Sequence, residues 1–104
     1  MSIAVALDEL AATLSRYPWG YLTTVSDDLR AHSLAVPMLV VDGALEAPAG
    51  RTTCANALAR PNVTLVCPPS EPGGYSLIID GAATVLDQTV RVVPASAVLH
   101  RPAL

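Results

Sequence analysis

The sequence predicts a mainly β protein, a small antiparallel six-stranded barrel with an N-terminal helix and one short helix. Hydrophobic residues alternate with other residues over much of the chain after residue 18, which is typical of strands that bury one face. Turns rich in glycine, proline and aspartate separate these runs, and no helical crossover lies between successive strands. We expect the sheet to close into a barrel, because closure removes exposed strand edges.

Length and composition predict a single domain, residues 1–104, that associates with a second copy. A chain of this size buries only about 60–65% of its extended surface on folding, so its core is thin. Of its residues, 52% are hydrophobic and 14% are charged. Because this apolar content exceeds what a small monomer hides, we expect a homodimer.

The N-terminal segment, residues 3–16, has the hydrophobic spacing of one amphipathic helix. Its apolar side chains are Val5, Leu7, Leu10 and Leu14. We expect the helix to end before Tyr17, since the residue that precedes Pro18 disfavours helical angles.

The next part of the chain predicts an antiparallel meander of three strands. These strands are expected at residues 19–25, 31–41 and 44–49. Asp42 and Gly43 join the second strand to the third. An Asp-Gly pair favours a two-residue hairpin turn, because both residues of that turn need positive φ.

The second half of the chain predicts a short helix and three more strands. The helix is expected over Thr52–Arg60 and stops at Pro61. The strands are expected near residues 62–68, 75–87 and 89–93. Asp80 and Gly81 lie in the middle of the long strand, where a glycine indicates a bulge or a sharp bend.

The charge of the chain argues against nucleic acid and membranes as partners. The net charge is −3, and all six basic residues are arginines that form no cluster. The N-terminal segment carries acidic residues within its apolar run, unlike a signal peptide, and no apolar run approaches the roughly 20 residues of a membrane span. We therefore expect a cytoplasmic protein.

The sequence contains no Ser-His-Asp set, metal-binding motif or glycine-rich nucleotide loop. Cys54 and Cys67 are expected to be buried free thiols, with a disulfide or a reactive thiol as the alternative. His32 is expected to be a structural or surface residue, with a place in a ligand groove as the alternative. His100 is expected in a loose C-terminal tail, although such a residue can also ligate haem or reach a neighbouring site.

The two aromatic residues at the start of the first predicted strand, Trp19 and Tyr21, share one face with Thr23 and Val25. We interpret both rings as core or interface anchors, because aromatic side chains bury large areas in cores and interfaces. Stacking on a ligand ring is the alternative.

Residues 49–60, AGRTTCANALAR, have the composition of an anion site at a helix start. The first N–H groups of a helix lack partners inside the helix, and the helix dipole favours negative charge there. Arg51 adds a charge-assisted pair, Thr52 and Thr53 add hydroxyl donors, and Gly50 permits close backbone approach. The alternative is that Thr52 or Thr53 caps the helix while Arg51 is solvated.

Four segments carry a resemblance to a known family: GYLTTVSDDLRAHSLAVPM, VVDGALEAPAG, RTTCANALARPNVTLV and GYSLIIDGAATVLD. Their order and spacing, from Leu10 to Leu99, resemble the split-barrel flavin-binding proteins related to pyridoxamine 5′-phosphate oxidase. The resemblance implies a split-barrel homodimer with flavin sites in the grooves between subunits. Members of this family use FMN or the deazaflavin F420, others bind haem, and some have no known activity.

The resemblance also implies which residues contact the cofactor. The strand along which the flavin ring lies carries Ala35, Val36 and Pro37. The phosphate position carries Ala49, Gly50, Arg51, Thr52 and Thr53. Arg30 and His32 match an Arg-x-His pattern of the first turn. The family's usual lysine aligns near Thr53 and is absent here, as is the aromatic residue that often follows the proline.

These features predict a flavin-binding split-barrel protein of oxidoreductase type, with FMN as the expected cofactor, F420 as the alternative and catalytic residues unknown. The absent lysine, the absent aromatic residue and the short C-terminus favour a second hypothesis. In that hypothesis the protein is a non-enzymatic dimer of the same fold that has lost the flavin or binds another small ligand such as haem. A third hypothesis is an unrelated small barrel that acts as an interaction module.

Overall fold

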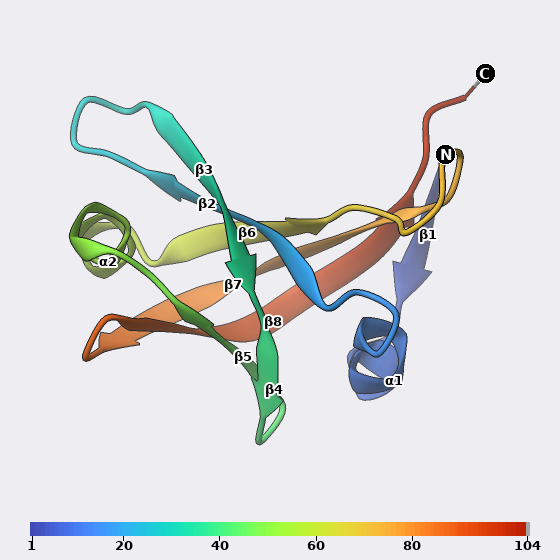
Figure 1. Ribbon diagram of the computed structural model, residues 1–104, viewed down its shortest axis with the longest axis horizontal. Coiled ribbons are helices and arrows are strands. Elements are labelled where there is room, and N and C mark those ends of the chain that lie inside the picture. Colours follow the sequence, from blue (N-terminus) through green and yellow to red (C-terminus); the bar gives the residue numbers. More distant parts are fainter. Residues whose placement is uncertain (104) are drawn as a thin grey trace.

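Eight β-strands form one antiparallel sheet in the computed structural model, which describes residues 1–103 (Figure 1). The strands are β1 (Ser2–Val5), β2 (Trp19–Val25), β3 (Ala31–Pro37), β4 (Leu39–Val41), β5 (Ala44–Pro48), β6 (Asn62–Cys67), β7 (Ser76–Leu86) and β8 (Thr89–His100). The helices are α1 (Leu10–Leu14), which follows a 3-10 turn (η1, Leu7–Glu9), and α2 (Arg51–Ala59). The predicted fold class is confirmed, with eight strands instead of six.

The two edge strands of the sheet, β3 and β4, are consecutive in the chain. The strand order is β3-β2-β6-β7-β8-β5-β4, with β1 paired to β8. Only Met38 separates β3 from β4, so residues 31–41 pair first with β2 and then with β5 near the opposite edge. This segment brings the two edges together, and Figure 1 shows β3 running into β4 across the other strands. The sheet is therefore curled into a split barrel.

The prediction of one helix over residues 3–16 is wrong at its start. Ser2–Val5 forms β1, which pairs antiparallel with β8 and places Ser2 opposite His100. The last strand is also longer than predicted, since it runs to His100 and not to Val93. β5 covers only the first part of the outer edge of β8, and β1 covers the last part. The spacing of apolar residues within residues 3–16 gives no information about the free edge of β8, which lies far along the chain and pairs with Ser2–Val5.

The turn between β4 and β5 has the predicted geometry. Asp42 and Gly43 have φ angles of 50° and 76°. Both values lie in the left-handed region, as a two-residue hairpin turn requires. Val41 lies opposite Ala44 across the turn, which completes the hairpin.

A bulge where β7 pairs with β8 confirms the prediction made from the mid-strand glycine. The register shifts between Asp80 and Gly81, and Ala95 on β8 is the extra residue. A Cβ atom at Gly81 would lie 2.5 Å from the carbonyl oxygen of Val93. Glycine is therefore required for the close approach of the two backbones.

The core lies inside the curled sheet. Its largest fully buried apolar side chains are Leu22, Leu45, Leu65, Leu77, Ile79, Val90 and Val92. α1 adds Leu10 and Leu14 to this cluster, and α2 adds Ala57. Figure 1 shows the two helices at opposite ends of the molecule, where each packs on the barrel. Neither helix of the described chain has the length and apolar character needed to cross a lipid bilayer.

Candidate functional site

The start of α2 presents backbone donors that have no partner inside the helix. Gly50 is the N-cap residue, with φ −76° and ψ 177°. The first helical hydrogen bond runs from the N–H of Cys54 to the carbonyl oxygen of Gly50, at 3.0 Å. The N–H groups of residues 51–53 therefore have no acceptor inside the helix and point outwards from its N-terminal end. Together with the helix dipole, they favour an anion at this position.

Arg51 and Thr52 present their side chains to solvent at this helix start, whereas Thr53 has only 4% of its surface exposed. The ion pairs within residues 1–103 involve other arginines, namely Arg30, Arg60 and Arg91. Arg51 has no carboxylate partner among the described residues. Its guanidinium is free to pair with a bound anion.

The alternative interpretation is wrong in its first part, that Thr52 or Thr53 caps α2, and confirmed in its second, since Arg51 is exposed to solvent. Gly50 occupies the N-cap position, and no side chain forms a capping hydrogen bond. The helix also starts one residue earlier than predicted, at Arg51. Without a capping side chain, the first N–H groups of α2 are left to solvent or a ligand.

A buried hydrogen bond holds α2 against the sheet. The side-chain amide of Asn56 donates to the hydroxyl of Thr24 on β2, with 3.2 Å between Nδ2 and Oγ1. Both residues are buried. Just before the helix, the N–H of Ala49 donates to the carbonyl oxygen of Gln88 in the β7–β8 turn, at 2.9 Å. These two contacts fix the position of the helix start on the barrel.

The Thr24–Asn56 bond is not predicted from the sequence, although a signal for it exists. Thr24 alternates in phase with Leu22, so its hydroxyl faces the core. A buried hydroxyl needs a hydrogen-bond partner. The partner comes from a helix 32 residues further along the chain, which no local pattern specifies.

The residues predicted to face the flavin ring lie on β3. Ala35 and Pro37 are exposed, and Val36 between them is buried. Ala35 lies opposite Tyr21 on β2, and Pro37 lies opposite Trp19. These four side chains therefore share the outer face of the sheet. No hydrogen bond joins this part of β3 to residues 49–53 in the described chain, and β2 connects the two regions by pairing with β3 and contacting α2.

Trp19 and Tyr21 form an exposed aromatic pair on this outer face. Their rings meet edge to face, with centroids 5.2 Å apart and planes inclined by 72°. The two residues are 40% and 42% exposed. This exposure excludes a place in the core, which leaves the interface and ring-contact interpretations.

Both cysteines are free thiols, as predicted, but the predicted burial is confirmed for Cys67 alone. Cys67 is buried in the core, and burial raises the pKa of its thiol to about 11. Cys54 is half-buried. Among residues 1–103, no three His, Cys, Asp or Glu side chains are grouped so that they could hold a metal ion.

The two histidines lie far apart in the chain, and the structure corrects the expectation for one of them. His32 is exposed on β3, as predicted for a surface residue. His100 does not lie in a loose tail, since it is the last residue of β8 and pairs with β1 and β7. Its Nδ1 atom is 2.9 Å from the hydroxyl oxygen of Ser2.

Two curated proteins are similar to this chain over most of their length. They are the uncharacterized proteins Mb0449c of Mycobacterium bovis and MT0457 of Mycobacterium tuberculosis. Each is 44% identical over 95% of this chain and 82% of its own length. No protein-family model matches the chain.

Several solved structures resemble the curled sheet and its helices. A "putative pyridoxamine 5′-phosphate oxidase" from Listeria innocua has a TM-score of 0.76 at 19% identity, covering 89% of this chain and 96% of its own. The FAD binding protein from Mycobacterium smegmatis has a TM-score of 0.71 at 21% identity, covering 97% and 100%. An F420 reductase has a TM-score of 0.65 at 17% identity, covering 82% and 93%. At these identities the likeness shows the fold.

Proposed function

Because this chain belongs to the same family as the two mycobacterial proteins and has the split-barrel fold of the pyridoxamine 5′-phosphate oxidase-like proteins, we propose that it binds a flavin-type cofactor. The start of α2 holds a phosphate of the cofactor, and the outer face of β3 lies along the ring. FMN is the expected cofactor, with F420 as the alternative. When bound, such a cofactor supplies hydride chemistry, while the protein orients it and excludes water.

The observation that carries this proposal is the unpaired guanidinium of Arg51 beside the unpartnered N–H groups at the start of α2. A phosphate accepts several hydrogen bonds at once, and a guanidinium can donate two of them in a bidentate pair. Gly50 leaves room for close approach, because nothing lies within 4 Å of the position of a Cβ atom there. The chemistry of these donors fits a phosphate group.

The outer face of β2 and β3 supports the placement of the ring. The small or flat side chains of Ala35 and Pro37 lie beside the exposed rings of Trp19 and Tyr21. A flavin ring packs well on apolar and aromatic surface. A second copy of the chain covers the other side of the ring in the proposed homodimer.

The absent lysine makes the phosphate site weaker than one with two cationic side chains. This observation favours the second hypothesis, a non-enzymatic dimer that has lost the flavin or binds haem. Thr53 also favours it, because its side chain is buried and therefore less accessible to a ligand than that of Thr52. The two hypotheses differ in which ligand the purified protein retains.

Titration of the purified protein with FMN, FAD, F420 and haem in turn, followed by absorbance and fluorescence, tests the proposal. We expect a flavin or F420 to bind, and Arg51→Ala to weaken that binding by about 10–100-fold, the value of a charge-assisted hydrogen bond to an ionised group. Arg16→Ala is the matched control, since Arg16 is also exposed but lies after α1 at the other end of the molecule. Uptake of haem alone, or of none of the four, refutes the proposal.

A further inference from the structure

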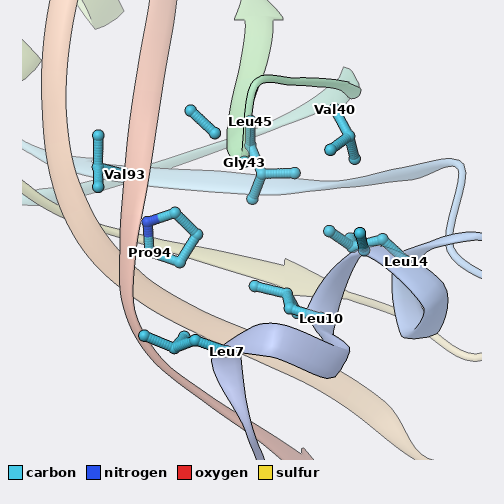
Figure 2. A pocket seen from close by; sticks show the side chains of 10 residues that line it. Leu7, Leu10, Leu14, Val40, Gly43, Leu45, Val93 and Pro94 are labelled. Carbon is cyan, nitrogen blue, oxygen red and sulfur yellow. The ribbon is translucent and has the colours of Figure 1, made fainter.

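An apolar cavity lies between α1 and the hairpin of β4 and β5, at the end of the molecule away from α2 (Figures 1 and 2). Its volume is about 170 Å³. Figure 2 shows Leu7, Leu10 and Leu14 on one side of the space, with Val40 and Leu45 facing them. Val93 and Pro94 of β8 form a further wall. The cavity is separate from the proposed flavin site.

Small residues opposite the helix leave this space open. Gly43 has positive φ in the β4–β5 turn, a conformation that favours glycine. Nothing lies within 4 Å of the position that a Cβ atom would occupy there. Ala44 follows it on β5, and Ala11 faces the cavity from α1. The leucines of α1 therefore meet a hairpin whose side chains are too short to fill the gap.

The cavity has a buried floor and an exposed mouth. Leu10 and Leu45 in the floor are 4% and 1% exposed. Leu7, Val40 and Val93 at the mouth are 50%, 42% and 49% exposed. A ligand can thus enter without unfolding of the barrel, and its apolar part would cover side chains that are otherwise in contact with water.

No side chain that lines the cavity carries a polar or charged group. Water needs two to four polar partners to be held in a cavity, so this site favours apolar groups over water. An engineered protein cavity of about 150 Å³ stays dry and binds benzene. The volume here therefore suits one six-membered ring or a short branched alkyl group.

The charged residues next to the lining residues in the chain are all acidic. Asp8 and Glu9 lie between Leu7 and Leu10, Asp42 precedes Gly43, and Glu46 follows Leu45. Glu46 is half-buried and pairs with Arg91, whereas the carboxylates of Asp8, Glu9 and Asp42 are exposed. Their charge disfavours an anionic ligand such as a fatty acid and favours a neutral or cationic one.

We propose that this cavity is a binding site for a small apolar molecule, or for the ring-sized apolar end of a larger one, that is neutral or positively charged. The inference does not rest on flavin binding, because the two sites share no residue. The floor and both walls come from one protomer, so the site is formed without residues of a second copy.

Three probes with one ring and different charges test this proposal: benzene, benzylamine and benzoate at pH 7. Binding is followed by the shifts of backbone amide resonances in two-dimensional NMR spectra. We expect benzene and protonated benzylamine to shift the amides of Ala11, Ala44 and Leu45. Benzoate is expected to bind at least about fivefold more weakly than benzylamine at low salt, since one unit charge nearby in water is worth about 1 kcal/mol. High salt is expected to reduce that difference.

A matched pair of variants locates the site. Ala11→Leu places a larger side chain in the cavity and is expected to abolish benzene binding, while Ala12→Leu changes the next exposed position of α1, which does not line the cavity. Val40→Phe at the mouth serves as a second blocking variant if Ala11→Leu does not fold. Equal binding by the Ala11 and Ala12 variants refutes the proposal. So does a set of shifts confined to parts of the chain other than the lining elements, which are η1, α1, the β4–β5 hairpin and the Val93–Pro94 part of β8. A change of oligomeric state caused by Ala11→Leu alone also refutes it, since that would mean that a second copy covers the cavity.

Discussion

The thiol of Cys67 illustrates how burial of a single residue changes its chemistry. The side chain is fully enclosed by the core, and its Sγ atom lies 3.9 Å from the sulfur of Met38. Burial raises the pKa of the thiol from 9.0 to about 11. At neutral pH the group therefore stays protonated and is a poor nucleophile, because the thiolate is the reactive form. Cys54, which is half-buried, is the more accessible thiol.

The raised pKa of Cys67 predicts a loss of stability in alkali. Between pH 9 and pH 11 the unfolded chain releases this proton while the folded chain keeps it, so the free energy of unfolding falls as the pH rises. The slope contributed by one such group is at most about 1.4 kcal/mol per pH unit. Urea unfolding between pH 8 and pH 11 measures it. Cys67→Ala is expected to be less stable at every pH but to show a shallower decline, and parallel curves would contradict the prediction.

At the scale of elements, α2 is positioned by one buried polar contact and by the turn that precedes β8. The Asn56–Thr24 bond joins the helix to β2, and β2 in turn pairs with β3. Through these contacts β2 connects α2 to β3, the two elements that carry the residues of the proposed cofactor site. A change in the bond therefore affects both stability and the proposed cofactor site.

We expect Asn56→Ala to lower the free energy of unfolding by about 1–3 kcal/mol, because it leaves the buried hydroxyl of Thr24 without a partner. Thr24→Val removes the hydroxyl with little change of shape. The double variant is expected to lose less unfolding free energy than the sum of the two single-variant losses, with a coupling energy of about 1 kcal/mol. Urea unfolding of the two single variants and the double variant measures the coupling. Strict additivity would show that the bond does not contribute.

At the scale of the whole molecule, the exposed apolar surface predicts self-association. Trp19 and Tyr21 lie on the outer face of the sheet beside the strand proposed to face the flavin. In a homodimer with flavin sites between subunits, this face is covered by the second copy. The covered area would account for the high apolar content of so short a chain.

Light scattering after size-exclusion chromatography tests this prediction, with an expected mass of twice the 10.8 kDa of one chain. Tyr21→Glu places a charge in the proposed interface and is expected to yield monomers. Leu29→Glu is the control, since Leu29 is 76% exposed in the β2–β3 turn, at the opposite end of this hairpin from Trp19. A monomeric parent protein, or equal dissociation of both variants, would contradict the predicted dimer.

The candidate site could be predicted only as two separate groups of residues. The glycine, arginine and threonines of residues 50–53 indicate a helix start with anion donors, and the structure places a helix start there. The burial of Thr53 and the absence of a side-chain cap depend on how α2 packs on the barrel, which the local sequence does not specify. The apolar cavity beside α1 is also absent from any local pattern, since three separate parts of the chain form it.

Alternation of side chains, the Asp-Gly turn and the mid-strand glycine determined most strands, the β4–β5 hairpin and the bulge, because each depends on residues close in the chain. The tertiary structure alone decided that Ser2–Val5 is a strand, since that segment is held by the free edge of β8, almost 100 residues away. It also decided that residues 31–41 join both edges of the sheet at Met38. Pairing between distant segments is set by which edges and faces remain uncovered once the barrel has closed, and no short window of sequence contains that information.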